Sequence, residues 1–204
     1  MKLIIISPPH YFKGEAEAVN ALMARAQFTL HLRKPNTETN ALRTLINAIE
    51  PCYHSRLVLH DGFELSGEFS LQGLHLNRRN SLAPQHFKGT ISCSCHSWEE
   101  VEAYSTLVDY LFISPLFDSL SKANYHQAFT HKELLEAQRR GLINTKVVGL
   151  SGITPDQLQY LYSLGFGGVA VIGSIWGDYS ESGDLPQLIE RLNLWNKEIK
   201  RYGI

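Results

Sequence analysis

Residues 146–156 read KVVGLSGITPD, residues 165–176 read GFGGVAVIGSIW, and a helical run at 157–164 joins them. Short unbroken apolar runs on either side of an amphipathic helix are typical of a parallel sheet covered by helices, so the pattern predicts strand, helix, strand. The two strands end in turns of small residues, Ser151-Gly152 and Gly173-Ser174. Such turns expose backbone N–H groups, and a following helix adds partial positive charge, so both turns suit a phosphate group. The alternative is that these glycines only allow tight turns.

The same alternation continues through the rest of the chain. We expect strands at 3–6, 28–33, 56–60, 74–76, 90–95, 109–113, 147–150 and 168–172. We expect helices at 15–26, 39–49, 98–107, 132–140, 157–164 and 185–202, with a short segment at 63–66 and one loose helical turn at 81–87. Eight strand–helix units without a linker predict a single compact (β/α)8 TIM barrel over residues 1–204, with function at the carboxyl ends of its strands. A doubly wound open sheet is the structural alternative.

Composition and charge narrow the class of protein. Apolar residues make up 44% and charged residues 19% of the chain, as in ordinary globular proteins. The net charge of −1 provides no basic field for nucleic acid and no polybasic anchor for a membrane, and no segment approaches membrane-spanning length. The three cysteines have no disulfide-type spacing, and the first apolar run is too short for a signal peptide. We therefore expect a cytoplasmic protein without nucleic-acid or membrane partners, and the sequence leaves a homodimer open.

Polar side chains share one face of two expected strands. Thr29, His31 and Arg33 alternate with apolar residues on the first, and Ser92, Ser94 and His96 alternate with Ile91, Cys93 and Cys95 on the second. In a barrel the outer face meets helices, so the polar face points inward, where an unpaired polar group costs about 1–3 kcal/mol. A ligand in the barrel mouth, or a hydrogen-bonded polar layer, would satisfy these groups. The cysteines on the opposite face are expected to be small buried thiols.

Charged residues at the expected strand ends indicate the kind of ligand. Arg33 and Lys122 are cations, and the two small-residue turns add backbone donors, so we expect a phosphorylated small molecule. Asp61 is a carboxylate placed directly at a strand end, and it could bind Mg²⁺ together with waters and ligand phosphates. An N-cap or salt-bridge role is the alternative for Asp61.

These motifs together resemble a family, thiamine phosphate synthase and its relative thiazole tautomerase, and the similarity runs from Phe28 to Ile175. It rests on LHLRK (30–34), LHD (59–61), GLHL (73–76), SCHSWEEV (94–101), DYLFISPLFDSLSK (109–122), VVGLSGI (147–153) and GVAVIGSI (168–175). The family joins hydroxymethylpyrimidine diphosphate to a thiazole phosphate and releases pyrophosphate. The resemblance implies that the diphosphate departs first, leaving a pyrimidinylmethyl cation that the thiazole nitrogen attacks.

The resemblance also implies a set of site residues and a cofactor. On the diphosphate side, the contacts would come from Arg33, Lys122 and Ser94, and Asp61 would bind Mg²⁺. Ser119 and Ser121 would stand where the family has threonines. The thiazole phosphate would be bound by backbone N–H groups of Ser151, Gly152, Ile172 and Gly173. His31 and His60 replace the family's glutamine and asparagine and would line the substrate site. The second Mg²⁺ aspartate is replaced by Asn80, so we expect weaker metal binding.

Further departures keep other functions open. A diphosphate lysine of the family is replaced by Pro35, and Lys34 cannot stand in for it because neighbouring strand residues point to opposite faces. The tautomerase histidine is replaced by Pro115, which cannot move a proton. The leading hypothesis is a synthase-type transferase. The alternatives are a regulatory or binding protein that keeps only the thiazole phosphate pocket, and an isomerase that uses His31 or His96.

Overall fold

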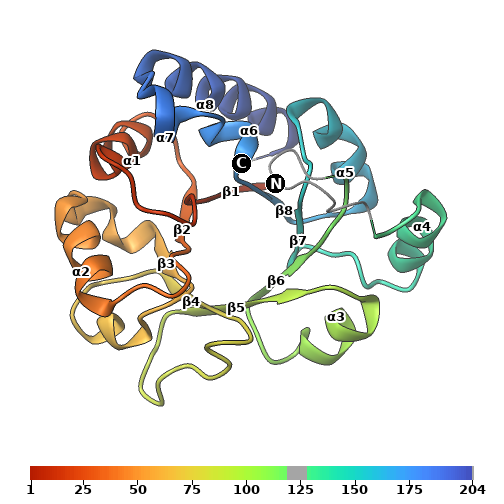
Figure 1. Ribbon diagram of the computed structural model, residues 1–204. Coiled ribbons are helices and arrows are strands. Elements are labelled where there is room, and N and C mark those ends of the chain that lie inside the picture. The colour runs from red at the N-terminus through yellow and green to blue at the C-terminus, as the bar shows by residue number, and fades with distance from the viewer. Residues whose placement is uncertain (119–127, 204) are drawn as a thin grey trace.

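The computed structural model describes residues 1–118 and 128–203, and within them eight parallel strands close into a barrel. The strands are β1 (Lys2–Ile6), β2 (Thr29–Leu32), β3 (Leu57–Leu59), β4 (Gly73–Leu76), β5 (Thr90–Cys95), β6 (Tyr110–Ile113), β7 (Val147–Leu150) and β8 (Gly168–Val171). Each strand pairs with the next in sequence, and β8 pairs with β1 to complete the ring (Figure 1). The expected (β/α)8 barrel is confirmed, and the open doubly wound sheet is wrong.

Helices surround this ring on the outside (Figure 1). The α-helices are α1 (Glu15–Met23), α2 (Thr39–Ala48), α3 (Trp98–Tyr104), α4 (His131–Arg139), α5 (Leu158–Leu164), α6 (Gly173–Trp176), α7 (Tyr179–Ser182) and α8 (Leu185–Ile199). The 3-10 helices are η1 (Pro51–Arg56), η2 (Phe63–Gly67), η3 (Pro155–Gln157) and η4 (Lys200–Tyr202). The loose turn expected at 81–87 is present as a single turn, in which the Phe87 N–H donates to the Pro84 carbonyl at 3.0 Å. Pro84 has no N–H, so the turn does not extend into a helix.

The strand alternation places apolar side chains on the outside of the barrel, under the helices. Leu30, Leu32, Cys93 and Cys95 all belong to the large core between the sheet and the helices, and both cysteines are free thiols. A smaller apolar cluster fills part of the barrel interior and consists of Ile4, Ile6, Tyr110, Phe112, Val148 and Ala170. The buried-thiol expectation is thereby confirmed.

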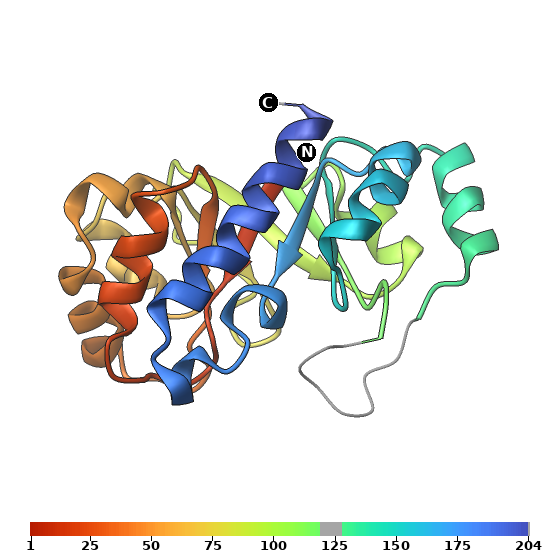
Figure 2. The ribbon, with the colours of Figure 1, turned by 90° about the horizontal axis from the view of Figure 1, so that it is seen from above.

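The two ends of the barrel differ. The Met1 ammonium donates hydrogen bonds to the carbonyls of Tyr202 (2.9 Å) and Gly203 (3.0 Å), so both termini lie at the amino end of the strands. Figure 2 shows this end at the top, with α1 and α8 side by side along one flank. The carboxyl ends of the strands lie at the opposite end. Among the described residues, no helix has the length and apolar character needed to cross a membrane.

Candidate functional site

The carboxyl ends of β2 and β3 and the loop after β4 bring a carboxylate and two arginines into one corner of the barrel mouth. Arg79 donates from Nε (3.0 Å) and Nη2 (2.9 Å) to Asp61 Oδ1. Asp61 is buried, whereas the Arg79 side chain is 40% exposed. Arg33 is half-buried and feels both charges, because repulsion from Arg79 lowers its pKa and attraction to Asp61 raises it. The corner can therefore present positive charge to an anion.

The Arg33 guanidinium is the cation of this corner that a ligand could contact. Burial is the main reason that the pKa of Arg33 is lowered, although a guanidinium still keeps its proton at neutral pH. Its backbone is fixed by the Ser7 hydroxyl, which accepts from the Arg33 N–H at 3.0 Å. Within residues 1–118 and 128–203, no hydrogen bond or ion pair holds the Arg33 guanidinium, so its donors are available to an anion in the mouth.

The loop after β4 folds back onto the end of β3. Asn77 Nδ2 donates to the His60 carbonyl at 2.6 Å, and Asn80 Nδ2 donates to the same carbonyl at 3.1 Å and to Asp61 Oδ1 at 3.3 Å. Asn77 and Asn80 also exchange backbone hydrogen bonds at 3.0 and 3.1 Å, which close the turn that carries Arg79. The Asn80 side chain therefore lies beside Asp61.

The hydrogen bonding of the Asp61 carboxylate shows whether the corner suits Mg²⁺. Its Oδ2 atom is buried and has no hydrogen-bond partner among the described residues, although Oδ1 accepts from Arg79 and Asn80. A buried, unpaired carboxylate oxygen is a strong ligand for a hard cation, and Mg²⁺ commonly binds one or two carboxylates together with waters and phosphates. The residues fit such an ion, with Asp61 Oδ2 as its protein ligand and the Asn80 amide beside it.

Directly beneath this corner, histidines fill the barrel interior. His31 and His60 are buried, and His31 Nδ1 lies 2.9 Å from His60 Nε2 in a hydrogen bond. The Tyr110 hydroxyl bonds His31 Nε2 at 2.8 Å. His75 stacks on His60 with ring centroids 4.1 Å apart, and its Nε2 bonds the Ser94 hydroxyl at 2.8 Å. Ser94 is therefore connected to the histidine cluster by its hydrogen bond to His75.

His75 and Tyr110 belong to this cluster, and the sequence reasoning did not single them out. The signal for His75 was present, since Gly73–Leu76 alternates and places His75 on the inner face. The register pairs Leu59 with Leu74, so the next residues along, His60 and His75, are neighbours across β3 and β4. Burial lowers the pKa of His75 to about 3 and the pKa values of His31 and His60 well below 6.5, so all three rings are neutral.

Lys34 lies outside the site, as the strand alternation predicted. Its ammonium pairs with Glu15 at 2.6 Å, and it donates to the carbonyls of Pro8 and His10 at 2.9 Å. Both side chains are buried, at 0% and 3% exposure. Lys34 therefore ties the loop after β1 to the start of α1, and it does not supply the cation that Pro35 replaces.

The turns after β7 and β8 lie at the same end of the barrel. Ser151 and Gly152 both have positive φ, 86° and 66°, and the Ser151 hydroxyl donates to the Phe117 carbonyl at 3.2 Å. A Cβ on Gly152 would lie 2.2 Å from the Asp118 carbonyl oxygen, so only glycine lets the loop after β6 approach. Ile172 is the N-cap of α6, which starts at Gly173, and the first N–H groups of a helix have no intrahelical acceptor. These turns can supply main-chain donors to a phosphate.

Three of the expected site residues, Ser119, Ser121 and Lys122, lie outside the described residues. The expected residues that the structure describes fall into two groups at the carboxyl end. One group lies at the ends of β2–β5 and consists of Arg33, His31, His60, Asp61, Asn80 and Ser94, and the other lies after β7 and β8 and consists of Ser151, Gly152, Ile172 and Gly173.

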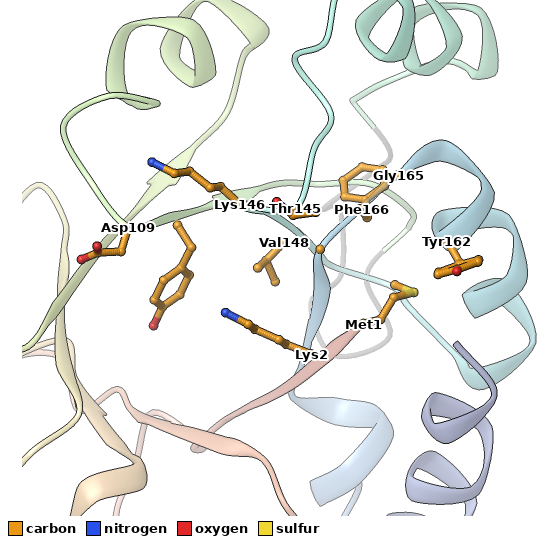
Figure 3. Close-up of a pocket in the computed structure, with 11 residues that line it drawn as sticks. Met1, Lys2, Asp109, Thr145, Lys146, Val148, Tyr162, Gly165 and Phe166 are labelled. Carbon is orange, nitrogen blue, oxygen red and sulfur yellow. The ribbon is translucent and has the colours of Figure 1, made fainter. Parts of the chain in front are cut away.

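A separate pocket opens at the opposite, amino end of the barrel. Figure 3 shows Lys2, Asp109 and Lys146 around its edge, and its volume is about 620 Å³. None of the expected site residues lines it. Because barrels of this class act at the carboxyl end of their strands, this pocket is not the candidate active site.

The closed parallel barrel, with charged and backbone-rich groups at the carboxyl ends of its strands, defines an enzyme-type (β/α)8 barrel that is suited to phosphorylated ligands. Residues 3–175 match the thiamine monophosphate synthase family. The chain belongs to this family, and the resemblance inferred from the sequence is confirmed.

Individual relatives agree with this assignment. The chain is 29% identical over 147 residues to the thiamine-phosphate synthase of Listeria monocytogenes serotype 4b, a match that covers 69% of this chain and 66% of that protein, slightly under two thirds of its length. A match to the thiamine-phosphate synthase of Nitrosomonas eutropha has 28% identity over 152 residues and covers 69% of this chain and 70% of that protein. The crystal structure of thiamine phosphate pyrophosphorylase from Bacteroides thetaiotaomicron is 38% identical, covers 98% of both chains and has a TM-score of 0.88.

Proposed function

We propose that the protein is a thiamine phosphate synthase, which joins hydroxymethylpyrimidine diphosphate to a thiazole phosphate and releases pyrophosphate. The observation that carries this proposal is the corner at the ends of β2–β4. Among the described residues, the Arg33 guanidinium and the buried Asp61 Oδ2 have no hydrogen-bond partner, and Arg79 pairs with Asp61 Oδ1. Two guanidinium groups and a metal-binding carboxylate are the chemistry that a departing diphosphate needs. Family membership supports the same reaction.

On the diphosphate side, the protein's task is to stabilise negative charge as the carbon–oxygen bond breaks. Arg33 would donate to the diphosphate oxygens, and Arg79 would add positive charge at the rim. Mg²⁺, when bound at Asp61, supplies charge neutralisation of the leaving pyrophosphate. Lys122, Ser119 and Ser121 are proposed to complete this side from the loop after β6. Ser94, held by His75, would place a hydroxyl at the floor.

On the thiazole side, the task is to hold the nucleophile in line. The N–H groups at Ser151-Gly152 and at Ile172-Gly173 would bind the thiazole phosphate through uncharged donors. His60 is neutral and would lie beneath the substrates, and the fully buried His31, whose ring nitrogens bond His60 and Tyr110, would hold His60 in place. Fixing both substrates in this way converts a bimolecular reaction into an oriented, effectively unimolecular one.

The test is product formation from both substrates. We expect thiamine phosphate and pyrophosphate in equal amounts, only when both substrates and Mg²⁺ are present. Either substrate alone should yield neither product. Binding of thiazole phosphate without turnover would instead support the regulatory binding protein, which the family match does not favour. A cytoplasmic location and a homodimer remain predictions.

A further inference from the structure

Three buried histidines lie together inside the barrel. One ring nitrogen from each of His31, His60 and His75 lies within 4.8 Å of the others. The rings come from three neighbouring elements, β2, the end of β3 and β4, and their centroids are 5.1, 5.4 and 4.1 Å apart. The residues proposed for Mg²⁺ binding, Asp61 and Asn80, are separate from these rings.

We propose that His31, His60 and His75 bind a divalent ion of the borderline class, Zn²⁺ or Co²⁺, at a site distinct from the Mg²⁺ site. Imidazole nitrogens favour such ions, whereas Mg²⁺ prefers oxygen. The separation of 2.9 Å between His31 Nδ1 and His60 Nε2 is close to the roughly 3.3 Å expected between two nitrogens that sit about 2.0–2.1 Å from a tetrahedral ion. The His60 and His75 rings are stacked with only 16° between their planes, so the His75 ring must turn to aim Nε2 at the ion.

The outer nitrogens of two of these rings are already fixed. The Tyr110 hydroxyl bonds His31 Nε2 at 2.8 Å, and the Ser92 hydroxyl bonds His75 Nδ1 at 2.8 Å. Ligand histidines usually carry such a second hydrogen bond, which sets the tautomer and aims the other nitrogen at the metal. This assigns His31 Nδ1, His60 Nε2 and His75 Nε2 as the ligands.

The site also meets the requirement for a fourth ligand. The Ser94 hydroxyl lies 2.8 Å from His75 Nε2 and is half-buried, so it or a water could complete a tetrahedron. Three protein ligands with an exchangeable fourth position are typical of zinc sites that open to a cavity. The inference does not depend on the proposed function.

The experiment uses the full chain, freed of metal with a chelator and titrated with Co²⁺, whose visible absorption reports tetrahedral nitrogen coordination. We expect one Co²⁺ per chain, displaced by Zn²⁺, and loss of the absorption in His31→Gln and His75→Gln. His86→Gln is the matched control, since His86 is exposed and away from the cluster. Circular dichroism checks that each variant folds.

A map of anomalous scattering from Co²⁺ in crystals of the unaltered protein keeps the test independent of variant folding. A peak between His31, His60 and His75 supports the proposal. No bound ion at equimolar Co²⁺ or Zn²⁺, a peak only at surface histidines, or absorption unchanged in folded His31→Gln and His75→Gln proteins would overturn it.

Discussion

Arg79 donates two hydrogen bonds to Asp61 Oδ1, from Nε at 3.0 Å and from Nη2 at 2.9 Å, while Oδ2 of the same carboxylate has no partner among the described residues. The guanidinium therefore neutralises part of the charge that would attract Mg²⁺. Arg79 lies in the loop after β4, where the family's pattern has a second carboxylate. In this chain Asn80 takes the place of that carboxylate. Metal affinity and diphosphate affinity should consequently respond to Arg79 in opposite directions.

Arg79→Gln should lower the Mg²⁺ concentration needed for half-maximal rate and raise KM for the diphosphate substrate. A partly exposed ion pair is worth up to about 1 kcal/mol, so each change should be roughly three- to five-fold. Arg78→Gln is the control, because Arg78 is an exposed neighbour in the same loop. Initial rates over a grid of Mg²⁺ and substrate concentrations measure both effects. An unchanged Mg²⁺ requirement in Arg79→Gln would show that the guanidinium does not compete with the metal.

Asp61→Asn should remove most of the Mg²⁺ response while leaving the fold intact, because the two side chains have the same shape. Loss of the metal-binding oxygen should reduce kcat/KM by about 100-fold or more, since metal charge stabilisation is worth several kcal/mol. Arg33→Ala should reduce it by about 10- to 100-fold, the value of a charge-assisted hydrogen bond. Arg139→Ala, on an exposed residue of α4 (75% exposed), is the control for loss of an arginine. Retention of full Mg²⁺-dependent activity in Asp61→Asn would contradict the assignment.

Lys34→Met should destabilise the protein strongly, because it leaves Glu15 buried without its ion partner. Breaking a buried pair in this way costs about 3–5 kcal/mol. The exposed pair of Arg43 and Glu68 (2.7 Å) offers a control, and Arg43→Met should destabilise the protein far less, because water screens this pair. Urea unfolding gives both values. If Lys34→Met costs no more than Arg43→Met, the buried pair does not hold α1 to the barrel.

Gly152→Ala should raise KM for the thiazole phosphate and leave KM for the diphosphate nearly unchanged. The new Cβ would collide with the Asp118 carbonyl at 2.2 Å, and the residue has a φ of +66°. Gly141→Ala separates the two causes, because Gly141 has a φ of +72° with nothing within 4 Å of an added Cβ. The control should show only the backbone cost, about 1–2 kcal/mol of stability. Equal effects on both substrates would argue against a thiazole phosphate site at this turn.

The metal-free protein should lose stability on acidification below about pH 6.5. Burial lowers the folded pKa of His75 to about 3 and those of His31 and His60 well below the unfolded value near 6.5. The unfolded chain therefore binds more protons in this window, and each histidine can remove up to about 1.4 kcal/mol per pH unit as pH falls. His75→Gln should flatten the pH dependence by that amount, and His86→Gln should not. Urea unfolding between pH 7 and 5 measures the slopes, and equal slopes for all three proteins would mean that His75 titrates normally.

The barrel could be predicted from sequence because its strands carry strong local signals. Val147–Leu150 and Thr90–Cys95 have the expected boundaries, since the first is an apolar run that ends in a small-residue turn and the second alternates polar with apolar residues. Alternation also predicted correctly that Lys34 faces away from the site. The segment at 81–87 forms a single turn, as expected, because Pro84 cannot donate the N–H that a longer helix needs.

The site was predictable only in part. Strand ends located Arg33 and Asp61 correctly at one corner, because parallel strands align their carboxyl ends. The pairing of Arg79 with Asp61 depends on a turn closed by Asn77 and Asn80, and a loop of this kind has no periodic signal. The approach of His75 to His60 depends on the register between β3 and β4, which is a tertiary property.

The most direct measurement is a crystal structure of the protein with both phosphorylated compounds and Mg²⁺. The account predicts the diphosphate on Arg33 with the metal on Asp61 Oδ2, and the thiazole phosphate on the backbone N–H groups after β7 and β8. Density for either phosphate at the amino end of the barrel, or a diphosphate that touches neither Arg33 nor a metal on Asp61, would contradict it.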